Sequence, residues 1–179
     1  MTALPGAAAL ASGATLEAGR LRLRMFHEGD LDGLAALYGD AETMRHIGDG
    51  RVLSREETWR AIAGMLGHWA LRGYGMWALE LADSGELVGR VGFIDPPGWP
   101  GFELGWLVAR PHWGKGYATE AATAALGHAV VALRRDRVIS LIRPGNRASA
   151  RVAAKIGMRQ ESAIEFLGGP VEVHAYAAR

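Results

Sequence analysis

The sequence predicts an α+β fold in which helices pack on one mixed β-sheet. Two observations lead to this prediction. Segments with a two-residue hydrophobic period alternate with segments of helical period, in the order strand, two helices, three strands, helix, strand, helix and terminal strands. In addition, 49% of the 179 residues are hydrophobic and 22% are charged, which suits one globular core, and no repeat or linker divides the chain.

The N-terminal part is expected to supply one strand and two helices. Residues 1–14 are rich in Ala and Gly and are interpreted as a flexible leader, so that the domain covers residues 15–179. Alternation of leucine and arginine from position 20 predicts a strand with one solvent-facing side. Asp30 is expected to cap the first helix. Ser54 and Glu57 form the S-x-x-E capping box of the second helix, which Gly73 ends. One face of that helix is expected to carry Trp59, Ile62, Leu66 and Trp69.

The remaining elements follow from turn residues and β-branched runs. Three strands are predicted at Met76–Leu81, Leu87–Ile94 and Glu103–Val108, separated by turn-forming segments. An Ala-rich helix comes next, and then a strand at Val138–Ile142. Asn146 is expected to cap a last helix and Gly157 to end it, before a closing strand at Val171–Tyr176.

Composition excludes several classes of function. A formal net charge of +1 and a pI near 8.2 give no basic footprint for a nucleic acid. The sequence has no cysteine, and its six histidines lack a metal-binding spacing, so no metal is expected. No apolar run reaches the length of a membrane span, and the N-terminus lacks the cationic start of a signal peptide. A cytoplasmic location is therefore expected.

A glycine-containing loop, Trp113 to Ala118 (W-G-K-G-Y-A), lies between a predicted strand and a predicted helix. Amides at a helix N-terminus bind phosphate, and glycine lets the oxygens approach. The spacing fits a pyrophosphate cradle and, equally well, a tight turn with an exposed Lys115. It does not fit the nucleoside-triphosphate loop, because Gly114-Lys115 precedes Gly116. The dinucleotide fingerprint of an oxidoreductase is disfavoured because Thr119 stands where its third glycine belongs.

A family resemblance favours the cradle. The segment from Leu104 to Ala121 (L-G-W-L-V-A-R-P-H-W-G-K-G-Y-A-T-E-A) resembles the acetyl-CoA motif of the GNAT superfamily, and most of all its RimJ/RimL-like subgroup. Further stretches agree in order and spacing, and the likeness covers about residues 15–179. They are Leu16 to Arg24, Gly89 to Phe93, and Asn146 to Ser149 with Lys155 to Met158.

The resemblance implies a GNAT-type acyl-CoA N-acyltransferase fold, with an about seven-stranded mixed sheet, splayed central strands and four flanking helices. Leu107 and Val108 would pair with the pantetheine arm of acetyl-CoA, which Asn146 and Ser149 would also contact. The pyrophosphate would be held by Trp113, Gly114, Lys115, Gly116, Tyr117, Ala118 and Thr119. Two positions depart from the superfamily: Trp113 replaces the usual Gln or Arg, and Ala153 stands where a tyrosine often serves as general acid.

The implied reaction is direct attack of a neutral primary amine on the acetyl thioester in a ternary complex, without a metal. At pH 7, deprotonation costs about 4.6 kcal/mol for a lysine amine and about 1.4 kcal/mol for an α-amino group. Glu103, at the start of its strand, is the candidate general base, and the alternative is an exposed carboxylate. Ser149 is a candidate proton donor to the thiol, and the alternative is a hydrogen bond within its own helix turn. His112 is a further candidate base, although surface packing is the favoured interpretation.

The acceptor stays open between a protein N-terminus and a small-molecule amine. It would be recognised by the loops His46–Leu53 and Asp95–Phe102. Three tryptophans would either line that site or pack in the core, namely Trp77, Trp99 and Trp106. A non-catalytic acyl-CoA-binding sensor is the alternative function, because Ala153 removes the usual acid. A homodimer is compatible with the sequence, which indicates no particular interface.

Overall fold

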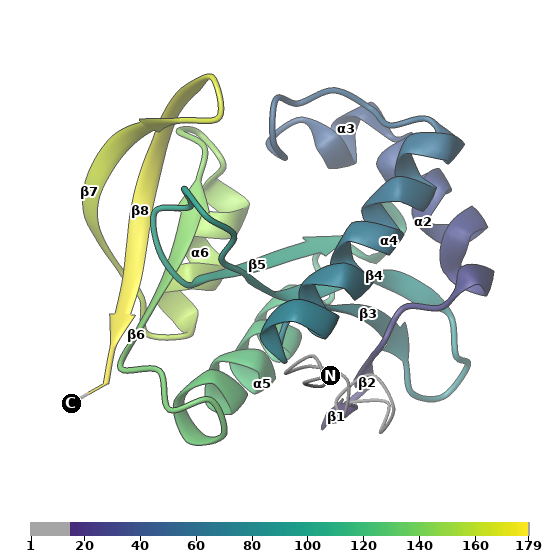
Figure 1. Ribbon diagram of the computed structural model, residues 1–179, viewed down its shortest axis with the longest axis horizontal. Helices are drawn as coiled ribbons and strands as arrows, with labels where there is room; N and C mark the ends of the chain where they lie inside the picture. The colour runs from purple at the N-terminus through teal and green to yellow at the C-terminus, as the bar shows by residue number, and fades with distance from the viewer. Residues whose placement is uncertain (1–14, 179) are drawn as a thin grey trace, which may run out of the picture.

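Eight strands form one sheet within residues 15–178, the part of the chain that the computed structural model describes (Figure 1). The sheet order is β1-β2-β3-β4-β5-β6-β8-β7. The strands are β1 (Leu16–Ala18), β2 (Leu21–Arg24), β3 (Met76–Leu81), β4 (Leu87–Ile94), β5 (Glu103–Val108), β6 (Arg137–Ile142), β7 (Arg159–Phe166) and β8 (Gly169–Ala177). Neighbours are antiparallel except β5 and β6, which are parallel. The predicted mixed sheet is confirmed, with β1 as an additional strand. The leader predicted for residues 1–14 lies outside the described residues.

Five α-helices lie in the same part of the chain. They are α2 (Leu31–Tyr38), α3 (Ala41–Met44), α4 (Arg55–Arg72), α5 (Tyr117–Val131) and α6 (Arg147–Lys155), with short 3-10 turns at η1 (Glu28–Asp30) and η2 (Arg110–His112). The expectation of four helices missed the one-turn helix α3. The predicted capping box of α4 is confirmed, because the Glu57 amide donates to Ser54 Oγ at 3.2 Å and the Ser54 amide donates to Glu57 Oε2 at 2.8 Å.

Helices cover both faces of the central strands, and each face has its own core cluster. Side chains alternate along β3, so Met76 and Ala78 face α2 and α4, whereas Trp77 and Leu79 face α5. Figure 1 shows α2 and α4 beside β3 and β4, α3 above them next to α2, and β6, β7 and β8 on the opposite side of the molecule. The loop after α3 and the β7–β8 hairpin thereby face each other across β5.

Asp30 occupies the N-cap position of α2 as predicted, but its side chain does not cap that helix. The turn η1 already begins at Glu28, so Asp30 lies inside the first turn, and its side chain makes no capping bond to α2. Its carboxylate instead accepts hydrogen bonds from Arg24 Nη1 at 2.8 Å and Arg24 Nη2 at 2.7 Å. Arg24 also bonds to Glu80, which is 7% exposed. The arginine side of β2 thus agrees with the predicted solvent-facing side at Arg22, whose side chain is 41% exposed, and differs from it at Arg24, which the ion-pair network leaves 18% exposed.

The predicted apolar face of α4 is correct for Trp69 and wrong for Trp59. Trp69 is 2% exposed and donates its indole N–H to the Met76 carbonyl at 2.9 Å, whereas Trp59 is 50% exposed. Ten residues separate the two, and at about 100° per residue their directions differ by about 80°. Trp59 therefore lies outside the strip of α4 that the core covers.

Gly92 in β4 is expected to tolerate no side chain. Its φ is +143°, and a Cβ atom there would lie 2.3 Å from the Gly75 carbonyl oxygen and 2.8 Å from Met76 Cα. We expect Gly92→Ala to lower the free energy of unfolding by about 2–4 kcal/mol, from backbone strain and overpacking. Urea denaturation would measure it. Gly64→Ala, in helix α4 where a Cβ atom would meet nothing within 4 Å, is the control and should stabilise the protein. Equal stability of Gly92→Ala and the wild type would contradict this account.

Candidate active site

The first part of the candidate site is the glycine loop between β5 and α5. Gly114 (φ +77°) and Gly116 (φ +86°) take left-handed conformations, and Gly116 directly precedes α5. The loop from Trp113 to Gly116 is exposed, and a Cβ atom on Gly114 would meet no atom within 4 Å. The first amides of a helix have no partner within the helix, and its dipole is positive there. This donor set fits a diphosphate, so the predicted roles of Gly114, Lys115, Gly116, Tyr117, Ala118 and Thr119 keep their physical basis and stay predictions.

Trp113 ties the loop to the end of β5. Its indole Nε1 donates to the Val108 carbonyl oxygen at 2.6 Å, while nearly half of the side chain remains exposed. Beside it, His112 is buried between two charged residues. Its Nε2 lies 3.0 Å from Glu86 Oε1, and its Nδ1 lies 3.4 Å from Lys115 Nζ. These contacts give His112 a structural role, as the favoured packing interpretation expects.

Arg20, in the β1–β2 turn, contacts the glycine loop. Sequence reasoning did not identify Arg20 as part of the site. Its Nη2 donates to the Lys115 carbonyl at 2.9 Å and to Glu120 Oε2 at 2.7 Å. Its guanidinium also lies 4.7 Å from the centre of the Tyr117 ring. The contact spans 95 residues of chain, so no local pattern signals it. It places a second cation next to Lys115 at the candidate diphosphate site.

The central strands β5 and β6 separate after one register pair. Glu103 pairs with Ile139, and the Ile139 amide donates to the Phe102 carbonyl at 3.0 Å. One residue further along, the hydroxyl of Ser140 donates to the Leu104 carbonyl at 2.6 Å, in place of a backbone bond. The predicted splay of the central strands is therefore present, and it opens a gap beyond Leu104.

The register of β5 determines which backbone groups face that gap. The Ala109 amide donates to the Val88 carbonyl at 2.8 Å. Hydrogen-bonded pairs recur at every second residue of an antiparallel ladder, so Leu107 exchanges its backbone bonds with Arg90 of β4. The backbone groups of Trp106 and Val108 point toward β6 instead. The edge of β5 that faces the gap therefore presents the backbone of Trp106 and Val108. Val108 has the predicted position. Trp106 takes the place expected for Leu107, and sequence reasoning did not name it as a cofactor contact.

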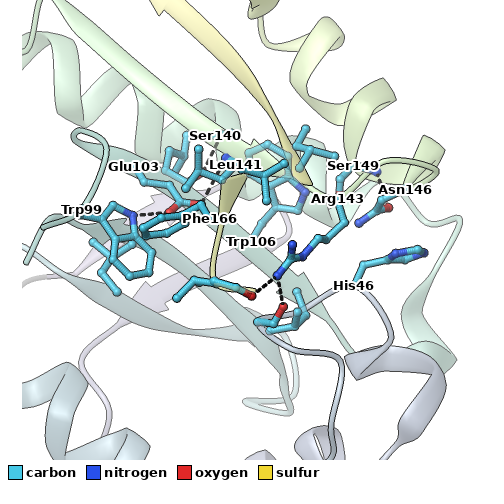
Figure 2. Close-up of a pocket in the computed structure, with 18 of the residues that line it drawn as sticks. His46, Trp99, Glu103, Trp106, Ser140, Leu141, Arg143, Asn146, Ser149 and Phe166 are labelled. Atoms are coloured by element: carbon cyan, nitrogen blue, oxygen red, sulfur yellow. Dashed lines mark hydrogen bonds between the residues drawn. The ribbon is translucent and has the colours of Figure 1, made fainter. Parts of the chain in front are cut away.

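A cavity of about 260 Å³ lies below the gap, and Glu103 forms part of its wall (Figure 2). Glu103 is 9% exposed, which excludes the alternative of an exposed carboxylate. Its Oε2 accepts a hydrogen bond from Trp99 Nε1 at 2.6 Å, and its Oε1 accepts one from the Leu141 amide at 3.3 Å. Burial raises the pKa of Glu103 above its usual value, against the lowering effect of these two bonds and of the Arg90 charge. A buried carboxylate with a raised pKa is the usual form of a general base that works near neutral pH.

Helix α6 brings Asn146 and Ser149 to the same cavity. The Asn146 side chain caps the helix as predicted, because its Oδ1 accepts a hydrogen bond from the Ser149 amide at 3.1 Å. Figure 2 shows both side chains on the side of the cavity away from Trp99. Ala153 is fully buried in the core, so the position of the superfamily's tyrosine faces the interior in this chain. Cofactor contact and proton donation by Ser149 stay predictions.

The rim of the cavity comes from three separate segments. The predicted acceptor loops supply His46 and Gly48 from the first and Trp99 from the second, and the β7–β8 hairpin supplies Phe166 and Leu167, which sequence reasoning missed. Phe166 packs edge-on against Trp99 at a ring distance of 4.9 Å. Of the three candidate tryptophans, Trp99 and Trp106 line the cavity, whereas Trp77 is fully buried in the core.

Arg143 holds two of these segments together. Its Nη2 donates to the Gly48 carbonyl at 2.8 Å and to the Leu167 carbonyl at 2.7 Å (Figure 2), and its Nη1 donates to the Pro170 carbonyl at 3.2 Å. All three partners are backbone oxygens. The guanidinium thereby fixes the width of the cavity between the loop after α3 and the β7–β8 hairpin.

Residues 15–178 lack two further classes of feature. No group of three or more His, Asp or Glu side chains in this part is arranged to hold a metal ion. None of its helices combines the length and apolar character needed to cross a bilayer.

These features describe an α+β protein with a glycine loop at a helix N-terminus and a buried carboxylate beside a gap in the sheet. The chain belongs to the GNAT acetyltransferase family, because the family's "Acetyltransferase (GNAT) domain" matches residues 20–159. YkkB of Bacillus subtilis is 32% identical to it over 163 residues, which are 87% of this chain and 91% of YkkB.

Solved structures of similar fold include two that hold coenzyme A. The acetyltransferase of Agrobacterium tumefaciens superposes with a TM-score of 0.81 at 30% identity, covering 92% of this chain and 95% of that one. RimL, a ribosomal L7/L12 α-N-protein acetyltransferase solved with coenzyme A, gives 0.78 at 21% identity over 92% and 98% of the two chains. Mycobacterium smegmatis RimJ, solved with a CoA disulfide, gives 0.75 at 22% identity over 93% and 87%. The predicted GNAT fold is confirmed, and RimL and RimJ are among the solved structures that share it.

Proposed function

We propose that this protein transfers an acetyl group from acetyl-CoA to a primary amine, by direct attack in a ternary complex. The observation that carries the proposal is the buried carboxylate of Glu103, which lies in the cavity wall where β5 and β6 separate. Family membership supports acetyl transfer, and the coenzyme A complexes of RimL and RimJ support the cofactor.

Each step has a group in this chain that suits it. Acetyl-CoA supplies the acetyl group as an activated thioester. The amides from Gly114 to Thr119 hold its diphosphate. The backbone of Trp106 meets the pantetheine arm at the gap, where Val108 offers only its amide because its carbonyl accepts the Trp113 indole N–H. Glu103 accepts the amine proton, directly or through water, and the Val108 amide polarises the thioester carbonyl. The N–C bond forms, the C–S bond breaks, and the released thiol takes a proton from water or Ser149.

The acceptor is a primary amine, either a protein N-terminus or a small molecule. An α-amino group loses its proton at pH 7 for about 1.4 kcal/mol, against about 4.6 kcal/mol for a lysine side chain. A single buried carboxylate therefore suits the deprotonation of an α-amino group better than that of a lysine side chain. The activity of RimL, on a protein α-amine, agrees with that preference.

The second candidate function is a sensor that binds acyl-CoA without turnover. The burial of Ala153 favours it, because that position offers no acid to the leaving thiol. A thiol pKa near 8.5 makes protonation at pH 7 worth only about 2 kcal/mol, so the absence of this acid slows transfer and does not prevent it.

Thiol release from acetyl-CoA in the presence of a broad amine panel separates the two functions. We expect turnover with at least one class of α-amine, together with coenzyme A binding measured by calorimetry. Binding of coenzyme A with no thiol release on any amine would favour the sensor. Absence of both binding and release would contradict both candidates.

A further inference from the structure

Arg90 enters the cavity from the same face of the sheet as Glu103. In the β4–β5 register, Glu103 pairs with Ile94 and Leu107 pairs with Arg90. Positions 90 and 94 lie on one face because side chains alternate along a strand. Arg90 also lines a neighbouring cavity of about 420 Å³, beneath Tyr38 and the loop after α3. Its side chain is therefore shared by two adjoining cavities, and its charge acts on the Glu103 carboxyl.

The guanidinium of Arg90 has no acidic partner among residues 15–178. Its Nη1 lies 3.5 Å from the sulfur of Met76, and its Cζ lies 5.8 Å from the centre of the Tyr38 ring. Its Nε is buried without a hydrogen-bond partner. A half-buried cation with an unsatisfied donor destabilises the free protein unless another group pairs with it. Arg135 has a similar Nε, but its guanidinium stacks on Phe102 at 4.6 Å and lines neither cavity.

The other charged groups around the two cavities already have partners. Arg143 is bonded to three backbone carbonyls, and Arg51 pairs with Glu57 at 2.8 Å and with Asp49 at 3.5 Å. Glu103 accepts the bonds from Trp99 and Leu141. Hydrogen bonds thus satisfy Arg143 and Glu103, and Arg90 is the charged group in these walls that keeps a buried donor without a hydrogen-bond partner in residues 15–178. A ligand with a second amine at this end would meet like charge, whereas an anionic group would be attracted.

We propose that the acceptor is a primary amine that also carries a carboxylate, and that Arg90 binds the carboxylate while the amine faces Glu103. The proposal rests on the acetyl transfer proposed above and names the substrate class. The planar fork of a guanidinium matches the two oxygens of a carboxylate. The carboxylate has two chemical sources: a free amino acid, or the acidic side chain at the N-terminus of a peptide.

The test compares matched acceptors on the wild-type protein. Free amino acids are assayed against their carboxamides, and peptides that begin with Glu or Asp against peptides that begin with Gln or Asn. We expect kcat/KM for the better carboxylate source to exceed that of its uncharged counterpart by about 10- to 100-fold, the effect of one charged hydrogen-bonded pair. Which pair shows the preference identifies the source.

Arg90→Gln should remove that preference. The variant is expected to lose activity on both acceptors through the effect of the Arg90 charge on Glu103, and to lose about 10- to 100-fold more on the carboxylate acceptor, because only the carboxylate pairs with the guanidinium. The ratio of the two activities does not depend on the fraction of folded protein. Arg159→Gln, at an exposed position on β7, is the matched control and should leave the ratio unchanged.

Two results would overturn the inference alone. One is equal or better turnover of the uncharged acceptors by the wild type, and the other is an equal loss on both acceptors in Arg90→Gln, which would make Arg90 a structural residue. Absence of turnover with every amine would instead contradict the proposed acetyl transfer, and this inference with it.

Discussion

Replacing Glu103 with Gln is expected to lower kcat/KM for acetyl transfer by about 10²- to 10³-fold, the usual contribution of a positioned general base. Gln keeps the size of the side chain and an oxygen for the Trp99 indole N–H, which is 2.6 Å from the carboxylate in the native protein. Coenzyme A should therefore bind as tightly as before, since the predicted cradle lies elsewhere. Steady-state thiol release and calorimetry measure the two quantities.

The pH profile separates a base from a structural carboxylate. Burial raises the Glu103 pKa above its ordinary value of 4.5, and the charged form is the one that accepts a proton. Activity should therefore be lost as the pH falls through that raised pKa. With an amine that titrates above neutrality, log kcat/KM should rise with slope 1 below the Glu103 pKa and stay level between that pKa and the amine pKa, because Glu103 then holds the proton that the amine loses. Glu103→Gln should show slope 1 throughout.

Glu165→Gln is the matched control for this prediction. Glu165 is exposed on β7, so the same chemical change there should alter neither the rate nor the profile. A Glu103→Gln variant that retains more than a third of the wild-type kcat/KM would exclude the carboxylate from proton transfer, and a water molecule would then have to take that role.

Gly114→Ala is expected to weaken coenzyme A binding by about 10- to 100-fold, the loss of one hydrogen bond to a charged group. In the free protein a Cβ atom at this position meets nothing within 4 Å, so the methyl group would obstruct only a ligand. Alanine at this left-handed position (φ +77°) should also lower the free energy of unfolding by about 1–2 kcal/mol, because of backbone strain. Calorimetric titration with coenzyme A measures the effect on binding.

Gly85→Ala is the matched control for the backbone strain that alanine introduces at position 114. Gly85 has φ +72° and open space around its Cβ position, but it lies in the β3–β4 turn. Both variants should lose similar stability, and only Gly114→Ala should lose affinity. Unchanged affinity in Gly114→Ala would show that the diphosphate does not approach this glycine, and equal losses of affinity in both would point to a general effect of strain.

Local patterns in the sequence predicted most of the fold. The strands Met76–Leu81, Leu87–Ile94 and Glu103–Val108 have the predicted bounds, because turn residues mark both ends of each. The reciprocal bonds of Ser54 and Glu57 follow from residues three positions apart. The short strand Leu16–Ala18 and the single turn Ala41–Met44 were missed, because three or four residues carry too little periodicity.

The candidate site was predictable only where it lies within one segment. The glycine loop and the Asn146 cap are read from neighbouring residues, and Glu103 from its place at the start of a strand. The contacts of Arg20 with Lys115 and of Arg143 with Gly48 each span 95 residues, and no short pattern indicates them. The unpaired Nε of Arg90 is likewise a property of packing, since its sequence context is that of an ordinary strand residue.

The hydrogen bond from the Leu141 amide to Glu103 crosses between the two halves of the sheet, beside the only register pair that joins β5 to β6 in residues 15–178. An amide bonds more strongly to a charged carboxylate than to a neutral carboxylic acid. Protonation of Glu103 is therefore expected to weaken this hydrogen bond between β5 and β6, and loss of the proton is expected to restore it. The proton transfer proposed for Glu103 and the contact between β5 and β6 would thus depend on the same side chain, and the chemical shift of the Leu141 amide should report its charge.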